Sequence, residues 1–588
     1  MKMMMKKYMV MAATCLMAVS CIDTVILPDD KTVDEDFWKT KGDVQLMTGG
    51  AYRSMLAADV VRRLIVWGDL RSDELLPVAS VPTNQAVLED LVEINTGNTQ
   101  YDNQFATWSA FYAVINNCNL VLAKAGAVVS EDPSYTEGDY LADRSQMLAL
   151  RALCYFYLVR AYRDVPYTTE AFMNSSQNMN IPQSDPESVL LACIADLEEA
   201  EPNAISPLAF NDWRRTGYFN RDGINALLAD LYLWLGSAER NASYCQKAVD
   251  YCDRVIESKK EQRRLARRGT LAAEADDDGY PLAEGRNAFN ELFVTQNAEE
   301  SIFELQFNGS NSNTGVCEML NMYANNRDRS YLVAPAMFAK GNTVYKTTGT
   351  SDNDYRALMN TYRGSGDELG VRKMVAQNLW LVNSAGGDAE AAATRRAYSN
   401  YDQNYIIYRL TDVMLMKAEA LMAQAAGSTD SIGKAADAVC LRQAFNLVQA
   451  VNLRSKEQPG DSMRWNTYSS GVQAVEELIL AERLRELAFE GKRWYDLLRY
   501  NYRRAGGTVN YNKTLADIKA EGGAFMPTYA PMLALMARKL GAQGSAVAAK
   551  LNTEPALYMP VPKNDLEVCD ALRQNPAYGT VGNYEKNY

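Results

Sequence analysis

The segment DGINALLADLYLWLG at residues 222–236, followed by ASYCQKAVDYCDRVIE at residues 242–257, decides the fold class of this chain. Apolar side chains recur at helical spacing in both segments: Ile224, Leu228, Leu231 and Leu235, then Cys245, Val249, Cys252 and Ile256. Each stripe predicts a helix with one buried face. Because the join is short, we expect the two helices to pack as an antiparallel pair.

The same pattern recurs on both sides of this segment. Similar stripes run through residues 108–122, 147–161 and 190–197, and residues 410–426 and 432–453 form a second clear pair. Antiparallel pairs that stack side by side are typical of tetratricopeptide repeats. We therefore predict a mainly α fold, a tetratricopeptide-like scaffold of about four helix pairs, although no strict sequence repeat is present.

Residues 258–405 differ in composition from the helical segments and are rich in Asn, Gly, Asp and Tyr. The segment SIFELQF at 301–307 alternates in a way that predicts a half-buried strand. The basic run at 259–268 and the acidic patch at 274–278 together indicate a solvated, mobile insertion. We predict a loop-rich insertion with a little β structure that carries the binding surface, because long loops in compact proteins are often functional.

The N-terminus indicates export. The segment MKMMMKKYMVMAATCLMAVSC at residues 1–21 has a basic start, an apolar run and small residues before Cys21, which is the layout of a secretory signal. The ending resembles a bacterial lipobox, which implies removal of residues 1–20 and lipid attachment at Cys21. The alternative is an ordinary signal with an incidental cysteine. Residues 21–35 would then form a flexible tether.

Composition excludes several classes of function. A net charge of −13 argues against nucleic-acid binding, which requires a basic surface. The chain has no histidine, which removes Ser-His-Asp and Cys-His nucleophile systems and HExxH zinc sites. None of the ten cysteines forms a CxxC pair. We predict neither a cofactor nor a metal site, with calcium left open.

One segment carries a family resemblance. The sequence AERLRELAFEGKRWYDLLR at 481–499 closely resembles the ERxxELxFEGxRWxDLxR signature of SusD/RagB-type proteins, and segments 36–52, 150–167, 405–421 and 559–576 follow in the family's order. The resemblance implies one domain over 36–588, with a helical scaffold at 36–257 and 406–503, the loop-rich region at 258–405 and a C-terminal segment at 504–588. It also implies an outer-membrane lipoprotein, facing the cell exterior, that binds glycans or peptides beside a SusC-type TonB-dependent transporter.

The chain departs from the family pattern in four places. Arg163 stands where the family usually has Gly before D-V-P, and Asp412 stands where Glu is commoner. Residues 528–553 resemble an added helical insertion, and the charged stretch at 258–285 is particular to this chain. These departures leave the predicted scaffold intact and the ligand undecided.

An enzymatic reading rests on the carboxylates of the signature. Glu482 and Glu486 lie one helical turn apart, a spacing that suits a glycosidase pair. However, Arg483, Arg485, Lys492 and Arg493 stand among them, and neighbouring cations lower the pKa that a general acid needs raised. We therefore predict ionised, paired carboxylates that join helices, and no catalytic residues.

A binding reading rests on aromatic side chains. Sugar rings present apolar C–H faces and polar edges, so binders combine flat rings with amides, carboxylates and Arg. The chain has 34 Tyr and 8 Trp. The candidate ligand-binding residues in irregular segments are Trp67, Tyr101, Tyr323, Tyr331, Tyr345, Tyr362 and Trp380, with Asn321, Asn325, Asn326 and Asp328 as polar neighbours. Oligosaccharide binding is the prediction; peptide binding and a protein-only scaffold or adhesin remain alternatives.

Overall fold

A computed structural model describes residues 37–578 except for 80–83, 175, 269–278, 308–315, 324–330, 347–353, 364–368, 384–388, 397–400, 426–430 and 457–462. The signal segment, Cys21 and the tether therefore lie outside the described residues. The α-helices are α3 (Lys41–Ser54), α4 (Ala58–Ile65), α5 (Gln85–Asn95), α6 (Ser109–Glu131), α7 (Glu137–Tyr162), α8 (Pro186–Ala200), α9 (Arg214–Gly217), α10 (Arg221–Ala238), α11 (Ala242–Arg267), α12 (Val316–Tyr323), α13 (Arg356–Met359), α14 (Leu410–Gln424), α15 (Ser431–Arg454), α16 (Trp465–Tyr468), α17 (Val472–Glu486), α18 (Arg493–Arg504), α19 (Leu515–Ala520), α20 (Ala530–Ala537), α21 (Gly544–Lys550) and α22 (Lys563–Val568).

The strands are short and form two-stranded antiparallel pairs in the described part of the chain. The pairs are β1 (Leu76–Pro77) with β5 (Leu332–Val333), β2 (Val165–Pro166) with β3 (Gln183–Ser184), β4 (Ser301–Leu305) with β10 (Tyr405–Arg409), β6 (Thr361–Arg363) with β7 (Leu369–Val371), and β8 (Ala376–Asn383) with β9 (Ala389–Arg395). The predicted mainly α fold with a little β structure is confirmed.

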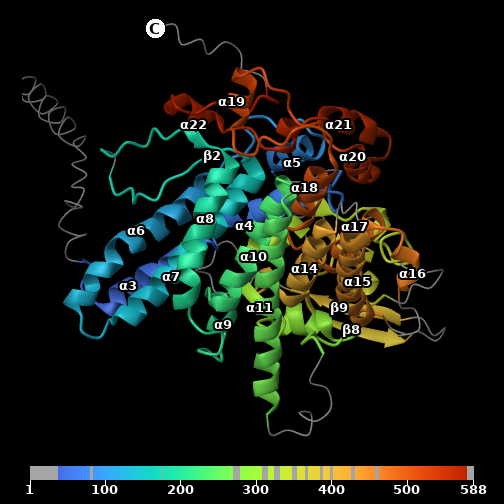
Figure 1. Cartoon of the computed structure of the whole chain (residues 1–588), viewed down its shortest axis with the longest axis horizontal. Coiled ribbons are helices and arrows are strands. Elements are labelled where there is room, and N and C mark those ends of the chain that lie inside the picture. Colours follow the sequence, from blue (N-terminus) through green and yellow to red (C-terminus); the bar gives the residue numbers. More distant parts are fainter. Residues whose placement is uncertain are drawn as a thin grey trace, which may run out of the picture.

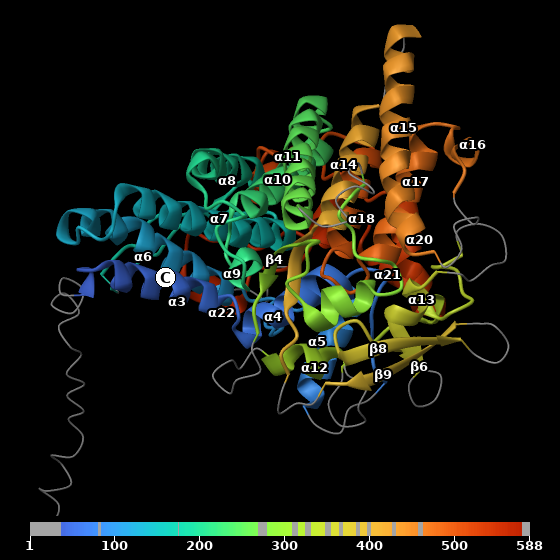
Figure 2. The ribbon, with the colours of Figure 1, turned by 90° about the horizontal axis from the view of Figure 1, so that it is seen from below.

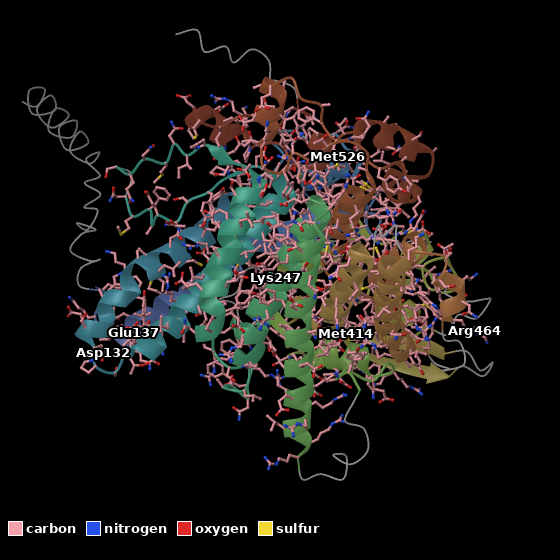
Figure 3. All side chains as sticks on the ribbon, in the orientation of Figure 1. Asp132, Glu137, Lys247, Met414, Arg464 and Met526 are labelled. Atoms are coloured by element: carbon pink, nitrogen blue, oxygen red, sulfur yellow. The ribbon has the colours of Figure 1, made fainter. Side chains whose placement is uncertain are left out.

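The long helices stand side by side and make the scaffold. α6, α7 and α8 pack in sequence, α10 packs along α11, α11 along α14, and α14 along α15 and α17. Figures 1 and 2 show these helices as one row, with β6, the β8–β9 hairpin and α12 on one side of it and the C-terminal helices α19–α22 across one end. Side chains such as Met414 fill the space between the helices (Figure 3). Both helix pairs that the sequence predicted, α10 with α11 and α14 with α15, are present.

Side-chain caps fix the starts of α10 and α11. The side chain of Asn220 accepts a hydrogen bond from the backbone N–H of Gly223 (3.1 Å) and caps α10, and Asn241 caps α11. Gly236 allows the close approach of the two helices, because a Cβ there would lie 2.7 Å from the sulfur of Cys245. The pair therefore depends on a small residue at its crossing point as well as on its apolar stripes.

The signature segment 481–499 spans two helices rather than one. α17 ends at Glu486 and α18 begins at Arg493. In the turn between them Gly491 has φ +72°, and its N–H donates to Asp69 Oδ1 (2.8 Å). The backbone of Gly491 also lies against Gly68, where an added Cβ would meet its carbonyl oxygen at 2.3 Å. The turn that contains Gly491 thus packs on, and is hydrogen-bonded to, the segment that directly follows α4.

Arg163, which replaces the glycine usual in the family pattern, adopts φ +69°. Such a conformation is costly for a side-chain-bearing residue. Its buried guanidinium forms ion pairs with Asp164 (2.7 Å) and Glu554 (2.8 Å) and donates to the backbone oxygens of Asn510 and Lys513. These bonds attach the C-terminal segment to the end of α7, so the departure from the pattern is compensated.

Two local predictions were wrong. The basic run at 259–268 is largely the last part of α11, where the buried Nζ of Lys259 donates to the backbone oxygens of Ser301 (2.6 Å) and Glu299 (3.0 Å). The strand β4 is buried along its whole length instead of on one face. Its polar side is covered because Glu304 faces the side chain of Asn404 and the backbone of Asn297. The helical prediction for 528–553 is correct, since α20 and α21 fall there.

Candidate functional site

Three of the predicted platform aromatics lie in the core. The Trp67 ring stacks on Phe111 (centroids 5.1 Å apart) and donates through Nε1 to the Phe105 carbonyl (2.9 Å). Tyr323 donates its hydroxyl to Asp69 Oδ2 (3.0 Å), and Tyr345 is equally buried. Protein surrounds these rings on all sides, so no ligand reaches them in this structure. Burial removes them from the candidate platforms.

The remaining predicted residues are scattered. Trp380 is 51% exposed on the β8–β9 hairpin, and Tyr362 is half-buried beside Arg395. Tyr331 is buried next to β5, Asn321 points toward Glu318, and Tyr101 lines a separate pocket described below. The polar candidates Asn325, Asn326 and Asp328 lie outside the described residues. The structure does not bring these positions together into one site.

A recess with the required chemistry lies elsewhere, between the end of α3, α9, β4 and the segment before β10. We call it the α9–β4 recess. It has a volume of about 540 Å³ and is lined by Gly49, Tyr52, Arg53, Leu56, Trp213, Gly217, Tyr218, Gln296, Asn297, Glu304, Leu305, Gln306, Phe307, Asp402 and Asn404. Ligand sites are typically concave and of this size.

One wall of the α9–β4 recess is aromatic. Trp213 is 46% exposed, and its ring meets Tyr218 edge to face with centroids 5.5 Å apart. Tyr218 in turn packs on Tyr52 at 4.7 Å, which anchors the wall to α3. Gly217 makes room for the indole, because a Cβ there would lie 2.8 Å from Trp213 Cε3 and 2.6 Å from Gln306 Cγ. The wall is therefore a supported flat ring that solvent can reach.

The floor of the recess is a network of amides around one carboxylate. Gln306 donates through Nε2 to Asn297 Oδ1 (2.7 Å), and Asn404 donates through Nδ2 to Gln306 Oε1 (3.0 Å) and to Glu304 Oε2 (2.8 Å). The backbone N–H of Asn297 also donates to Glu304 Oε2 (3.3 Å). The amides are thus held in fixed orientations before any ligand arrives.

The amide network hydrogen-bonds only one of the two carboxylate oxygens of Glu304. The Glu304 side chain is fully buried, and none of the amides donates to its Oε1. The buried hydroxyl of Ser301 also acts on this carboxylate and lowers its pKa. Burial raises the pKa of Glu304 in spite of the hydrogen bonds that it accepts. An unsatisfied buried acceptor costs about 1–3 kcal/mol, so a ligand hydroxyl that donates to Oε1 would recover that energy.

The backbone that carries the floor is strained. Gln296 and Asn297 are consecutive non-glycine residues with φ of +63° and +49°. The conformation is held by Arg215, which donates to the Asn297 carbonyl (2.9 Å), and by Gln296 Nε2, which donates to the Asp402 carbonyl (2.9 Å). Strain of this kind concentrates at ligand-binding positions.

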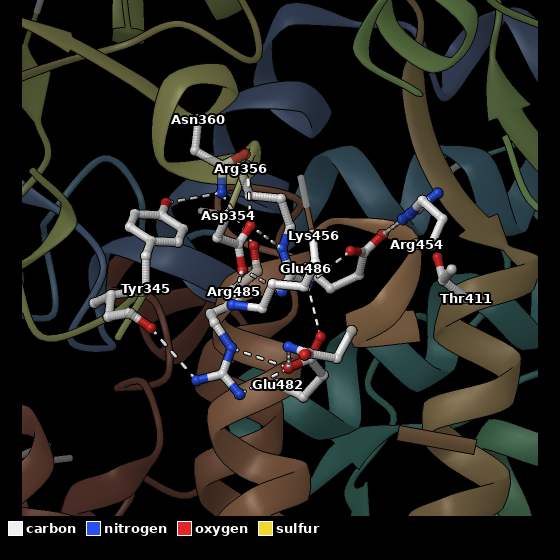
Figure 4. A network of polar contacts seen from close by, with 12 residues as sticks. Tyr345, Asp354, Arg356, Asn360, Thr411, Arg454, Lys456, Glu482, Arg485 and Glu486 are labelled. Atoms are coloured by element: carbon white, nitrogen blue, oxygen red, sulfur yellow. Dashed lines mark hydrogen bonds and ion pairs between the residues drawn. The ribbon is translucent and has the colours of Figure 1, made fainter. Parts of the chain in front are cut away.

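The carboxylates of the signature segment have the opposite character (Figure 4). Glu482 accepts from Arg356 Nη1 (2.7 Å) and Arg485 Nη2 (2.7 Å), and Glu486 accepts from Arg409 Nη1 (2.6 Å) and Arg356 Nη1 (3.0 Å). Burial alone would raise the pKa of Glu486, but the surrounding guanidinium groups hold it well below its ordinary value. The predicted paired, ionised network that joins helices is confirmed.

Metal-binding groups are absent from the described residues, where no three His, Cys, Asp or Glu side chains gather closely enough to hold an ion. The seven cysteines whose side chains are described are free thiols.

The α9–β4 recess combines an exposed aromatic wall, amides held in fixed orientations and the buried carboxylate of Glu304. These are the groups that recognise a polyhydroxylated ligand.

Sequence reasoning missed most of the residues that line this recess. Trp213 and Tyr218 flank α9 in the connection between α8 and α10. The glycine between them, Gly217, was the available signal, because glycine beside aromatic residues indicates a close approach of chain segments. Gln296, Asn297, Glu304, Gln306, Asp402 and Asn404 do fall within the region 258–405 that the sequence predicted to carry the binding surface.

Family models match two parts of the chain. A model described as the SusD family matches residues 319–578, and a model described as starch-binding and associating with the outer membrane matches residues 71–233. Among curated proteins, SusD-like protein P38 of Formosa agariphila is 24% identical over 516 residues, covering 84% of this chain and 92% of the relative. SusD-like protein P2 of the same organism is 25% identical, covering 84% and 91%.

Solved structures share the fold. A SusD superfamily protein from Bacteroides thetaiotaomicron superposes with a TM-score of 0.60 at 19% identity, covering 92% of this chain and 99% of that chain. A laminarin-binding SusD-like protein superposes with a TM-score of 0.59 at 19% identity, covering 92% and 100%. At these identities the likeness concerns the fold, which is the tetratricopeptide-like helix-pair scaffold.

Proposed function

Because this chain belongs to the SusD family, we propose that it is a binding protein, not an enzyme, that captures oligosaccharides in the α9–β4 recess. The observation that carries the proposal is the exposed ring of Trp213 above a fixed amide floor that contains the carboxylate of Glu304, whose Oε1 receives no amide donor. A sugar ring stacked on Trp213 would direct its hydroxyl groups at that floor. The match to a starch-binding family model and the laminarin-binding structural neighbour support a glycan as the ligand.

The proposal includes the location and the partner. Cys21 carries the lipid, the protein faces the cell exterior from the outer membrane, and bound oligosaccharide passes to a SusC-type TonB-dependent transporter. Support comes from the lipobox-like ending at residues 18–21 and from the family's description as associating with the outer membrane. Replacing Cys21 by Ala is expected to move the protein from the membrane fraction to the soluble fraction of the cell envelope. Retention of this variant in membranes would contradict lipid anchoring.

Absence of catalysis rests on the state of the carboxylates. A glycosidase needs two carboxyl groups across the scissile bond. In the recess Glu304 is joined only by Asp402, which forms an ion pair with Arg396. The carboxylates of the signature are all engaged with cations. Incubation of purified protein with the bound oligosaccharide is expected to return it intact, and release of shorter sugars would contradict the proposal.

The binding test uses two tryptophans of similar exposure. Calorimetric titration with soluble polysaccharides and their oligosaccharides would identify the ligand, with peptides as the comparison arm. Trp213→Ala is expected to weaken binding by about ten- to a hundredfold, since an aromatic contact of this size contributes about 1.5–3 kcal/mol. Trp380→Ala is the matched control, exposed to 51% against 46%, and should leave the affinity unchanged.

Each alternative has a distinct outcome in this test. Binding of peptides without glycans would favour the peptide-binding branch of the family. Binding of neither, together with capture of protein partners alone, would favour a scaffold or adhesin. Loss of glycan binding in Trp380→Ala with full binding in Trp213→Ala would move the site from the recess to the β8–β9 hairpin.

A further inference from the structure

A second pocket lies between the end of α5 and the helical insertion that contains α20 and α21. We call it the α5–α20 pocket. It has a volume of about 580 Å³, and it shares no lining residue with the α9–β4 recess. Ile94, Met536, Val547 and Leu551 make an apolar side, and Arg71, Trp494 and Lys539 line it as well. The pocket is therefore apolar on one side and positively charged on another.

Arg71 is a buried guanidinium without a carboxylate partner in the described part of the chain. It is 8% exposed and lies over the Trp494 ring, with its central carbon 4.4 Å from the ring centroid. Its Nη2 donates to the Leu557 carbonyl (2.5 Å), but Nη1 has no hydrogen-bond partner among the described residues. The buried Arg163 and Arg409, in contrast, each pair with at least two carboxylates. A buried charge left unpaired is costly, so Arg71 points to an anion that the pocket receives.

Two further polar groups in this pocket are unsatisfied within the described residues. The indole Nε1 of Trp494 has no acceptor, and Oδ1 of Asn95 has no donor. Lys539 adds a second basic group: its Nζ donates to the carbonyls of Leu70 (2.7 Å) and Leu75 (2.8 Å), and the nearby Asp73 and Glu74 favour its charged form. Burial lowers the pKa of Lys539 to about 7, and a bound anion would favour its charged form. An anionic group that accepts hydrogen bonds from Arg71 and Trp494, together with a hydroxyl that donates to Asn95, would satisfy these polar atoms.

We propose that the α5–α20 pocket binds an anionic sugar residue, whose charged oxygen atoms accept hydrogen bonds from Arg71 and Trp494. A hydroxyl of the same residue donates to Asn95 Oδ1, and its apolar face lies on Met536 and Leu551. The negative charge belongs to a carboxylate, as in a uronic acid, or to a sulfate ester. α20 and α21 come from the 528–553 insertion, which the sequence marks as an addition to the family pattern.

The test compares three sugars that differ at one position: glucuronate, glucose 6-sulfate and glucose, titrated into the purified protein. Binding of either anionic sugar at least tenfold tighter than glucose is expected, and the sugar that binds identifies carboxylate or sulfate as the source of the charge. Hydrogen exchange measured by mass spectrometry should show protection of residues 94–101 and 536–551. Equal binding of all three sugars, or no binding, would overturn the proposal.

Substitutions locate the site and separate it from the recess. Arg71→Gln and Asn95→Leu should each weaken binding of the anionic sugar at least fivefold, while Trp213→Ala should not change it. Arg144→Gln removes an equal charge at a surface pair with Glu199 and serves as the control. Because Arg71 is buried, thermal unfolding must show that its variant folds; Asn95 is half-buried at the end of α5, so its variant gives an independent result. Unchanged binding in Asn95→Leu would contradict the assignment, whatever the recess binds.

Discussion

Two buried acidic regions of this protein differ in how completely their charges are paired. In the signature network Glu482, Glu486 and Glu490 each accept hydrogen bonds from Arg or Lys side chains on other segments. In the α9–β4 recess Glu304 is just as buried, yet no cation pairs with it and none of the surrounding amides donates to its Oε1. A network in which each carboxylate is paired with cations stabilises the fold, whereas a buried carboxylate held only by neutral groups is available to a ligand.

The largest effect is expected from breaking the complete network. Arg409 is buried between Glu300, Glu486 and Glu490, so Arg409→Met leaves these carboxylates with fewer cations. Removing one partner from a buried ion pair typically lowers the free energy of unfolding by about 3–5 kcal/mol. Chemical denaturation would measure this loss.

The control for this measurement is an exposed pair. Arg144→Met breaks the surface pair with Glu199 and should cost at most about 1 kcal/mol. Equal losses in the two variants would mean that the buried network has no special role in stability, and the contrast between the two acidic regions would lose its basis.

A smaller effect, on affinity and not on the fold, is expected in the recess. Glu304→Gln replaces the charged acceptor by a neutral one, and a hydrogen bond to a charged group contributes about 1.5–3 kcal/mol. Oligosaccharide binding should therefore weaken about tenfold or more, measured by calorimetry. Glu482→Gln, in the signature network, should leave binding unchanged while it lowers the free energy of unfolding. Weaker binding in Glu482→Gln with unchanged binding in Glu304→Gln would contradict the roles that we give to the two regions.

The smallest effect concerns pH. Because burial raises the folded-state pKa of Glu304 above its ordinary value of 4.5, the folded state holds this proton more tightly than the unfolded state does. The contribution of Glu304 to stability is therefore fully present below about pH 4.5 and is lost as the pH rises through the raised folded pKa.

Glu304→Gln cannot lose this proton, so its stability relative to the wild-type protein should increase as the pH rises above 4.5. Denaturation curves of both proteins at a series of pH values would give this difference directly. A difference that stays constant across the series would show that Glu304 is not perturbed by burial.

The sequence predicted the scaffold because its signals are local. The stripe at Ile224, Leu228 and Leu231 needs only its own helix to be interpreted, and the paired state of Glu486 follows from the Arg residues around it in the signature. The recess is a different case. Trp213, Asn297, Glu304 and Asn404 come from segments that only the folded scaffold brings together, and the alternation of β4 predicted an exposed face for Glu304 that neighbouring segments bury.

The rejected platform residues show the same limit. Trp67 and Tyr323 lie near irregular segments, which favours a binding role from the sequence alone, but the composition of a segment does not determine which rings solvent reaches. Exposure of an aromatic residue depends on its neighbours in space, and a single sequence does not specify them.

The central claim is that the ligand completes the hydrogen bonding of Glu304. A crystal structure of the protein with the oligosaccharide identified by titration tests it most directly. We predict a sugar hydroxyl within about 2.5–3.0 Å of Glu304 Oε1, with a sugar ring on the face of Trp213. An oligosaccharide bound elsewhere, with the recess open and Glu304 Oε1 still unpartnered, would contradict the account.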